Sequence, residues 1–162
     1  WDNNLKAAQL AEAAGLDFVI ALYKGGLPAL IDVMSGQAHL NISSILQTMP
    51  HIRSGKLKPV ATGGSKRAAS LPDLPTISES GVPGYEGNFW WAVASPAGTP
   101  RAIVARLNSE VAAWLRMPET QKLFTNEGAE VDIKTPEQLQ RMIAAEMAKW
   151  AKVARDAGMK KE

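Results

Sequence analysis

The sequence contains no cysteine and only two histidines, His39 and His51, among its 162 residues. Without thiols, disulfide bonds, thiolate nucleophiles and sulfur-ligated metals are all excluded. The sequence also lacks G-x-S-x-G, H-E-x-x-H and phosphate-loop patterns. We therefore predict that the chain is not an enzyme, has no catalytic residues, and holds neither a metal ion nor a cofactor.

An excess of one charge and long apolar runs are missing as well. The 18 basic and 16 acidic side chains leave a net charge of +2, which is too weak to indicate binding to nucleic acid or to an anionic membrane. No apolar run approaches the roughly 18 residues that a membrane-spanning helix needs. Hydrophobic residues make up 46% of the chain and charged residues 21%, which is typical of a globular protein. The expected partner is a small ligand or another protein.

Hydrophobic periodicity predicts alternating helices and strands, which is the pattern of an α/β fold. Four short apolar runs are predicted strands, and the first fits a strand covered on both faces. These runs are 18–22, 38–42, 57–62 and 89–95. Helices are predicted before, between and after them, at 5–14, 29–34, 48–53, 100–115 and 136–153.

Capping signals mark the starts of several elements. Thr99-Pro100 and Thr135-Pro136 each place threonine before a proline, which is tolerated in the first turn of a helix. Gln138 stands at the capping-box position of the second start, and Glu79 stands at the same spacing after Thr76. The rest of 66–100 is rich in proline, glycine and serine, so we predict an irregular crossing between two lobes.

Two polar or glycine-rich loops follow predicted strands and are candidate ligand sites. The two glycines in 23–29 let backbone N–H groups approach an anion just before the start of a helix. An ordinary strand-to-helix turn has the same composition. Residues 41–44 end the next strand, where α/β proteins commonly place ligand contacts, although a plain polar loop would look alike.

Aromatic residues at 89–91 and the lone histidine at 39 carry less information. Phe89-Trp90-Trp91 is predicted to fill the core, because aromatic side chains in a strand do so more often than they form a binding platform. His39 lies inside an apolar stretch, and we interpret it as a hydrogen-bonded structural residue rather than a ligand group.

Seven stretches resemble, in the same order, the receptors of tripartite tricarboxylate transporters, the Bug family. They are 23–30 (YKGGLPAL), 34–37 (MSGQ), 46–58, 65–67 (SKR), 71–76 (LPDLPT), 81–86 (GVPGYE) and 96–100 (PAGTP). They are spread in order over residues 23–100, and we expect the resemblance to extend over nearly the whole chain. The sequence departs from many relatives at His39, where they carry Asp, and at Ile42-Ser43-Ser44, where they carry Phe-Asp-Asn. These departures leave the preferred ligand open.

The resemblance implies an incomplete periplasmic-binding-protein-like fold of type II. Members of the family are roughly twice this length, with two α/β lobes that close over a carboxylated ligand. Residues 1–64 would then form part of lobe 2, 65–100 the inter-lobe crossing with an irregular segment, and 101–162 a C-terminal helical segment that returns to lobe 1. The start at Trp1 instead of Met agrees with a sequence that begins inside a longer protein.

By the same resemblance, we predict a periplasmic receptor that binds a small carboxylate and delivers it to membrane transporter subunits. The carboxylate would be a di- or tricarboxylate, an amino acid or an aromatic acid. The alternative is a sensory or regulatory interaction module built on the same receptor fold. The predicted ligand contacts are Tyr23, Gly25, Gly26, Leu27, Pro28, Ala29, Asn41, Ser43 and Ser44. Because the two C-terminal helix faces need an apolar partner, we expect the 162 residues alone to self-associate.

Overall fold

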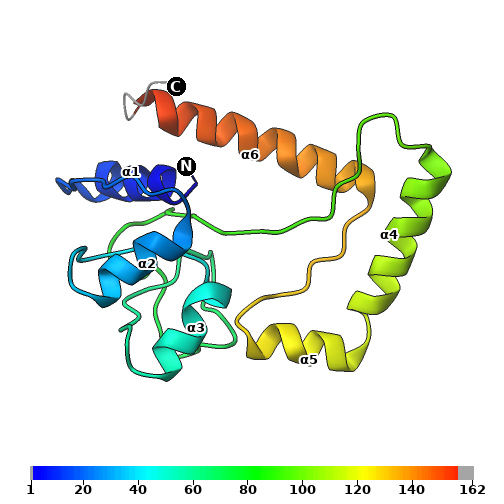
Figure 1. Ribbon diagram of the computed structural model, residues 1–162. Helices are drawn as coiled ribbons and strands as arrows, with labels where there is room; N and C mark the ends of the chain where they lie inside the picture. The colour runs from blue at the N-terminus through cyan, green and yellow to red at the C-terminus, as the bar shows by residue number, and fades with distance from the viewer. Residues whose placement is uncertain (1, 157–162) are drawn as a thin grey trace.

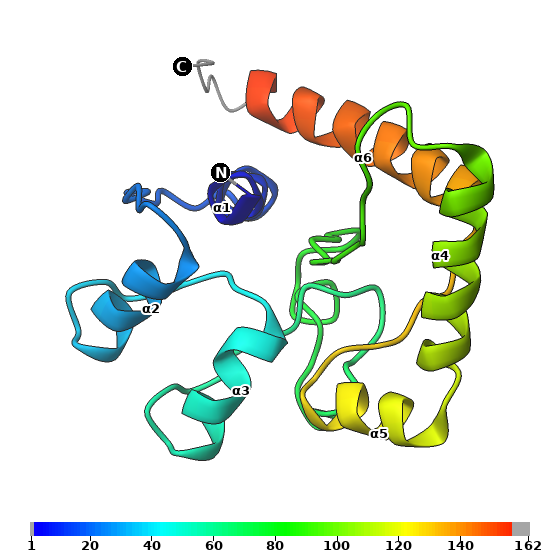
Figure 2. The same ribbon diagram turned by 45° about the vertical axis from the view of Figure 1, so that its right-hand side comes forward.

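The computed structural model describes residues 2–156, and these contain six helices. The helices are α1 (Asp2–Ala14), α2 (Gly26–Met34), α3 (Ile45–Arg53), α4 (Arg101–Leu115), α5 (Pro118–Asn126) and α6 (Pro136–Asp156). In both views α6, α4 and α5 lie along three sides of an open arrangement, with α1, α2 and α3 on the other side (Figure 1, Figure 2). Helix α6 contacts both α1 and α4 and so joins the two groups.

Local signals place the ends of the longer helices close to where the sequence predicts them. Helix α1 stops before Gly15, whose φ of 62° suits glycine. Helix α6 opens with a reciprocal capping box, in which the Thr135 N–H donates to Gln138 Oε1 (2.8 Å) and the Gln138 N–H to Thr135 Oγ1 (3.2 Å). Helix α4 begins one residue later than predicted, because Thr99 donates its hydroxyl to the Pro96 carbonyl (2.8 Å) instead of capping the helix.

Three helices, α1, α2 and α3, begin three residues earlier than predicted, and α5 was not predicted. Helix α2 already includes Gly26 to Pro28, since a proline in the first turn costs no intrahelical hydrogen bond. Helix α3 starts after Ser44, which caps it. No apolar stripe predicted α5, whose start is marked by Pro118 in its first turn. An edge-to-face contact between Trp114 and Phe124, with ring centres 5.8 Å apart, packs α5 against α4.

The prediction of four strands is wrong for the described residues, which contain one isolated parallel bridge between Thr62 and Thr76 and no strand. A strand exists only where a neighbour completes its ladder of hydrogen bonds, and these segments have no such neighbour in the described part of the chain. Their apolar side chains are correspondingly open to solvent, with Val19 100%, Leu22 66% and Val93 73% exposed. These segments are apolar enough to form strands, but the described part of the chain offers them no neighbouring strand to pair with.

The core is small and is extended by one buried cation. The buried apolar residues in the described part are Ala8, Leu30, Met49, Tyr85 and Ala112. Lys6 of α1 is only 1% exposed, and its ammonium lies 4.0 Å from the centre of the Phe89 ring and 4.8 Å from that of Trp150. These cation–π contacts bind α1, the crossing segment and α6 together.

The prediction that 89–91 fills the core is wrong: Phe89 is only half-buried, and the two tryptophans after it are exposed. Trp90 is 43% and Trp91 60% exposed, because no sheet neighbour covers them. Within residues 2–156, no helix combines the length and the apolar character that crossing a bilayer requires.

Candidate functional site

The candidate site lies where the N-termini of α2 and α3 approach each other near the middle of the molecule (Figure 1). Gly26 is the first residue of α2, and Gln47 lies in the first turn of α3. The side-chain oxygen of Gln47 lies 3.2 Å from the point that a Cβ on Gly26 would occupy. The structure therefore brings the two predicted ligand loops, 23–29 and 41–44, to one place.

The first turn of α2 is open to an anion. Gly25 precedes the helix with φ 122° and ψ 170°, a backbone conformation that side chains disfavour, and no side chain caps the helix. The first turn contains no acidic residue, so the partial positive charge of the helix N-terminus is not neutralised there. Leu27 and Pro28 are exposed and Ala29 is half-buried. Because Pro28 has no N–H, the amides of Gly26 and Leu27 are the donors available to a ligand.

Tyr23 fixes the loop before α2 rather than offering a free hydroxyl. Its hydroxyl donates to Asp32 Oδ2 at 2.7 Å, from the loop back onto the helix. This hydrogen bond, together with partial burial and the charge of Asp32, raises the pKa of the Tyr23 phenol. Tyr23 was predicted to contact the ligand, but its hydroxyl is already engaged in this structural hydrogen bond.

The three predicted residues of the second loop have three different environments. Ser44 is buried (4% exposed), and its Oγ accepts the Gln47 N–H at 3.3 Å as the cap of α3. Ser43 is half-buried and donates its hydroxyl to Gln47 Oε1 at 3.0 Å. The Nδ2 group of Asn41 is buried and has no hydrogen-bond partner in the described part of the chain. A buried donor without an acceptor is costly, so a ligand oxygen there would relieve a real deficit.

Gln47 is the residue of this site that the sequence analysis missed. It contacts the Gly26 position and Ser43, one from each predicted loop. A usable signal was present, because Ser44 and Gln47 have the same spacing as the capping box that was noticed at Thr76 and Glu79.

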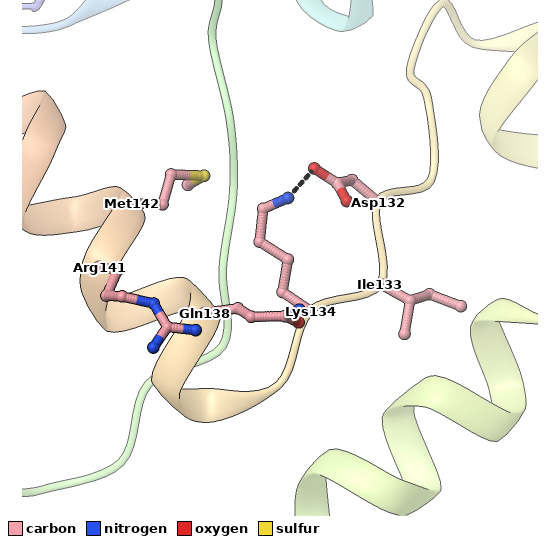
Figure 3. Close-up of a pocket in the computed structure, with 6 residues that line it drawn as sticks. All are labelled: Asp132, Ile133, Lys134, Gln138, Arg141 and Met142. Atoms are coloured by element: carbon pink, nitrogen blue, oxygen red, sulfur yellow. Dashed lines mark hydrogen bonds and ion pairs between the residues drawn. The ribbon is translucent and has the colours of Figure 1, made fainter.

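A second candidate is an open hollow of about 520 Å³ beside the first turns of α6 (Figure 3). It is lined by Asp132, Ile133, Lys134, Gln138, Arg141 and Met142. Lys134 is paired with Asp132 at 2.5 Å, and Gln138 is engaged in the capping box of α6. We therefore place the site at α2 and α3, where the helix dipole and the open backbone amides favour an anionic ligand. The described residues contain no group of three or more His, Asp or Glu that could hold a metal ion.

Comparison with known proteins identifies relatives over almost the entire chain. A family model described as "Tripartite tricarboxylate transporter family receptor" matches residues 2–159. BugT of Bordetella pertussis is 34% identical over 152 residues, which are 94% of this chain and 46% of BugT.

Solved structures agree with that match. Rpa4515 of R. palustris with adipate has a TM-score of 0.92 and 38% identity, covering 97% of this chain and 52% of that one. The periplasmic binding protein BugD has a TM-score of 0.87 and 35% identity, covering 99% and 54%. MatC (Rpa3494) from Rhodopseudomonas palustris with bound malate has a TM-score of 0.74 and 28% identity, covering 93% and 52%.

These matches confirm the predicted fold class and family. The chain has part of a periplasmic-binding-protein fold, and it spans about half the length of the relatives it matches. The family consists of solute-binding receptors, which agrees with the prediction that the chain is not an enzyme. The chain belongs to the family of tripartite tricarboxylate transporter receptors, the Bug family.

Proposed function

We propose that this chain supplies one half of a two-lobed receptor that binds a small carboxylate between its lobes. The observation that carries the proposal is the open N-terminus of α2, which has no acidic residue in its first turn and faces the 41–47 segment. The matched structures of Rpa4515 with adipate and MatC with malate support a carboxylate as the ligand. Di- and tricarboxylates, amino acids and aromatic acids all fit this class.

The proposed binding chemistry uses backbone groups more than charged side chains. One ligand carboxylate accepts from the amides of Gly26 and Leu27 at the positive end of α2. The buried Nδ2 group of Asn41 donates to the same ligand and so gains the acceptor that it lacks. Closure of a second lobe would exclude water and strengthen these hydrogen bonds.

The exposed surface of the chain supports the proposal that it packs against the rest of a larger two-lobed receptor. The chain exposes 11279 Å², whereas a compact protein of 17.4 kDa exposes about 7,900 Å². The excess is about 3,400 Å², more than the roughly 1,000–2,500 Å² that one partner usually contributes to a permanent interface. Much of it comes from apolar side chains on the unpaired segments and on α4, where Ile103 is 51% and Leu107 47% exposed.

The remaining features of the receptor follow from the same proposal. Residues 1–64 belong to lobe 2, 65–100 form the crossing, and 101–162 return to lobe 1. The receptor works in the periplasm and delivers its ligand to the membrane subunits of a tripartite tricarboxylate transporter. The name of the matched family and the periplasmic relative BugD support this location and partner.

Calorimetric titration of the receptor with both lobes present tests the proposal. The panel is adipate, malate, citrate, aspartate and benzoate, with adipamide as the uncharged match to adipate. We expect micromolar or tighter binding of at least one acid and none of adipamide, because the site recognises the negative charge. Binding of adipamide as tight as that of adipate, or no binding of any acid, would overturn the proposed function.

A further inference from the structure

The chain contains three sequences of the form Ser/Thr-x-x-Glu/Gln, and only two of them behave as capping boxes. At Thr76 the backbone N–H donates to Glu79 Oε2 (2.7 Å), and the Glu79 N–H donates to Thr76 Oγ1 (3.0 Å). Thr135 and Gln138 form the same pair of bonds. In each box, the two side chains each accept a backbone N–H that the start of a helix or turn would otherwise leave without a partner.

The third pair, Ser44 and Gln47, makes only half of the box. Ser44 Oγ accepts the Gln47 N–H, as in the other two. The Gln47 carboxamide, however, does not return to the Ser44 N–H; its Oε1 accepts the Ser43 hydroxyl at 3.0 Å and faces Gly26. A side chain with the right spacing for a stabilising bond has thus been turned toward the start of α2.

The position of the Gln47 carboxamide relative to α2 is significant. In a helix the Cα–Cβ direction leans toward the N-terminus, so the absent Cβ of Gly26 marks the space at the open end of α2. Gln47 Oε1 lies 3.2 Å and Nε2 3.8 Å from that point. The carboxamide therefore lies beside the path by which an anion would approach the first amides of the helix.

This arrangement also explains why glycine occupies position 26. Gly26 is not among the glycines with positive φ, so its backbone does not require glycine, in contrast to Gly25. A Cβ at Gly26 would instead press on the end of the Gln47 side chain. The glycine leaves room for Gln47.

We propose that Gln47 determines the ligand specificity of this site: Ser43 holds its oxygen, and its Nε2 group donates to the carboxylate bound at α2. The inference rests on the proposed function and deepens it. A neutral amide supplies hydrogen-bond donors without repelling an anion. A carboxylate in the same place would occupy the anion position itself and repel the ligand.

Gln47→Glu is the decisive variant, tested by calorimetric titration of the two-lobed receptor with adipate and malate. We expect affinity for the better of the two acids to fall by at least about 30-fold, because a like charge then faces the ligand. The melting temperature should stay unchanged or rise, since an acidic residue in the first turn favours α3 and can complete the capping box. A loss of binding without a loss of stability separates a specificity role from a structural one.

Gln138→Glu is the matched control, because it makes the same substitution at the same position of the α6 capping box. It should leave affinity within about twofold of the wild type. Gln47→Ala should weaken binding about tenfold through the loss of one hydrogen bond to a charged group. Gly26→Ala should weaken binding about tenfold in the wild type but less than threefold when Gln47 is already alanine, because the added methyl acts by displacing Gln47.

The outcomes distinguish this inference from the proposed function. If the wild-type receptor binds none of the acids, the proposed function fails. If the wild-type receptor binds an acid and both Gln47→Glu and Gln47→Ala keep their affinity within threefold of the wild type, the proposed function is supported. The proposed role of Gln47 is then overturned. Equal losses for Gln47→Glu and Gln138→Glu would also overturn it, because the effect would then follow from charge at any helix start.

Discussion

Gly128 offers a quantitative test of how α5 packs against the helix that carries the candidate site. It follows α5 with φ +82°, and a Cβ there would overlap the Ile45 side chain, lying 3.1 Å from its Cβ and 3.3 Å from Met49 Cε. Ile45 is the first residue of α3, and Met49 is only 3% exposed. Met49 is buried, and Ile45 is half-buried and β-branched, so it has few alternative rotamers.

The expected cost of Gly128→Ala has two parts. A positive φ costs an alanine roughly 1–2 kcal/mol relative to glycine. Forcing an extra methyl into a packed contact costs typically about 1–3 kcal/mol more. The free energy of unfolding should therefore fall by about 2–5 kcal/mol, which is a large share of the roughly 5–15 kcal/mol that holds most proteins folded.

Gly55→Ala separates the two parts experimentally. Gly55 also has positive φ (+71°), but no atom lies within 4 Å of the position of its absent Cβ. Denaturation by guanidinium chloride, analysed by linear extrapolation, should show a loss of only about 1–2 kcal/mol for this control. The difference between the variants measures the clash with Ile45. Equal losses for both would refute the close contact between the α5 terminus and α3.

Three further predictions concern the buried tyrosine, the cap of α3 and the exposed surface. Burial raises the pKa of the Tyr85 phenol to about 12; stability from its protonated form is therefore complete below about pH 10 and lost as pH rises through 12. A titration followed at 295 nm should show a step near pH 12 that Tyr85→Phe lacks, and complete ionisation below pH 11 would contradict it. Ser44→Ala should lower the free energy of unfolding by about 1 kcal/mol in thermal denaturation, whereas the half-buried neighbour Ser43→Ala should change it much less. The 162 residues alone should form dimers or larger species in light scattering, because their excess apolar surface needs cover; a stable monomer would speak against this.

The local features of the fold were largely accessible from the sequence. Helix periodicity predicted α4 and α6, and the spacing at Thr76 and Thr135 predicted the two reciprocal capping boxes. Such signals act within a few residues, so a single sequence contains all the information that they need. The family resemblance added the fold class, because its strings occur in order along the chain.

Features that depend on distant partners could not be predicted in the same way. The apolar runs at 18–22 and 89–95 looked like strands, but pairing depends on neighbours that the described chain does not supply. The contact of Gln47 with Gly26 joins two different helices, and the local spacing of Ser44 and Gln47, which the sequence analysis did not use, indicates only an ordinary capping box. The nine residues predicted to bind the ligand remain a prediction, although the structure gathers both loops at the start of α2 and α3.

The cation–π contact of Lys6 has a consequence for the order in which the molecule folds. Trp114 and Phe124 are only ten residues apart in the sequence, so their contact closes a short loop and can form early. Lys6 and Trp150 stand near opposite ends of the chain, and bringing them together carries the entropy cost of a very long loop. During synthesis Phe89 can cover one side of Lys6 early, but the Trp150 side stays uncovered until α6 has been made, so the joining of α1 to α6 belongs to the late steps of folding.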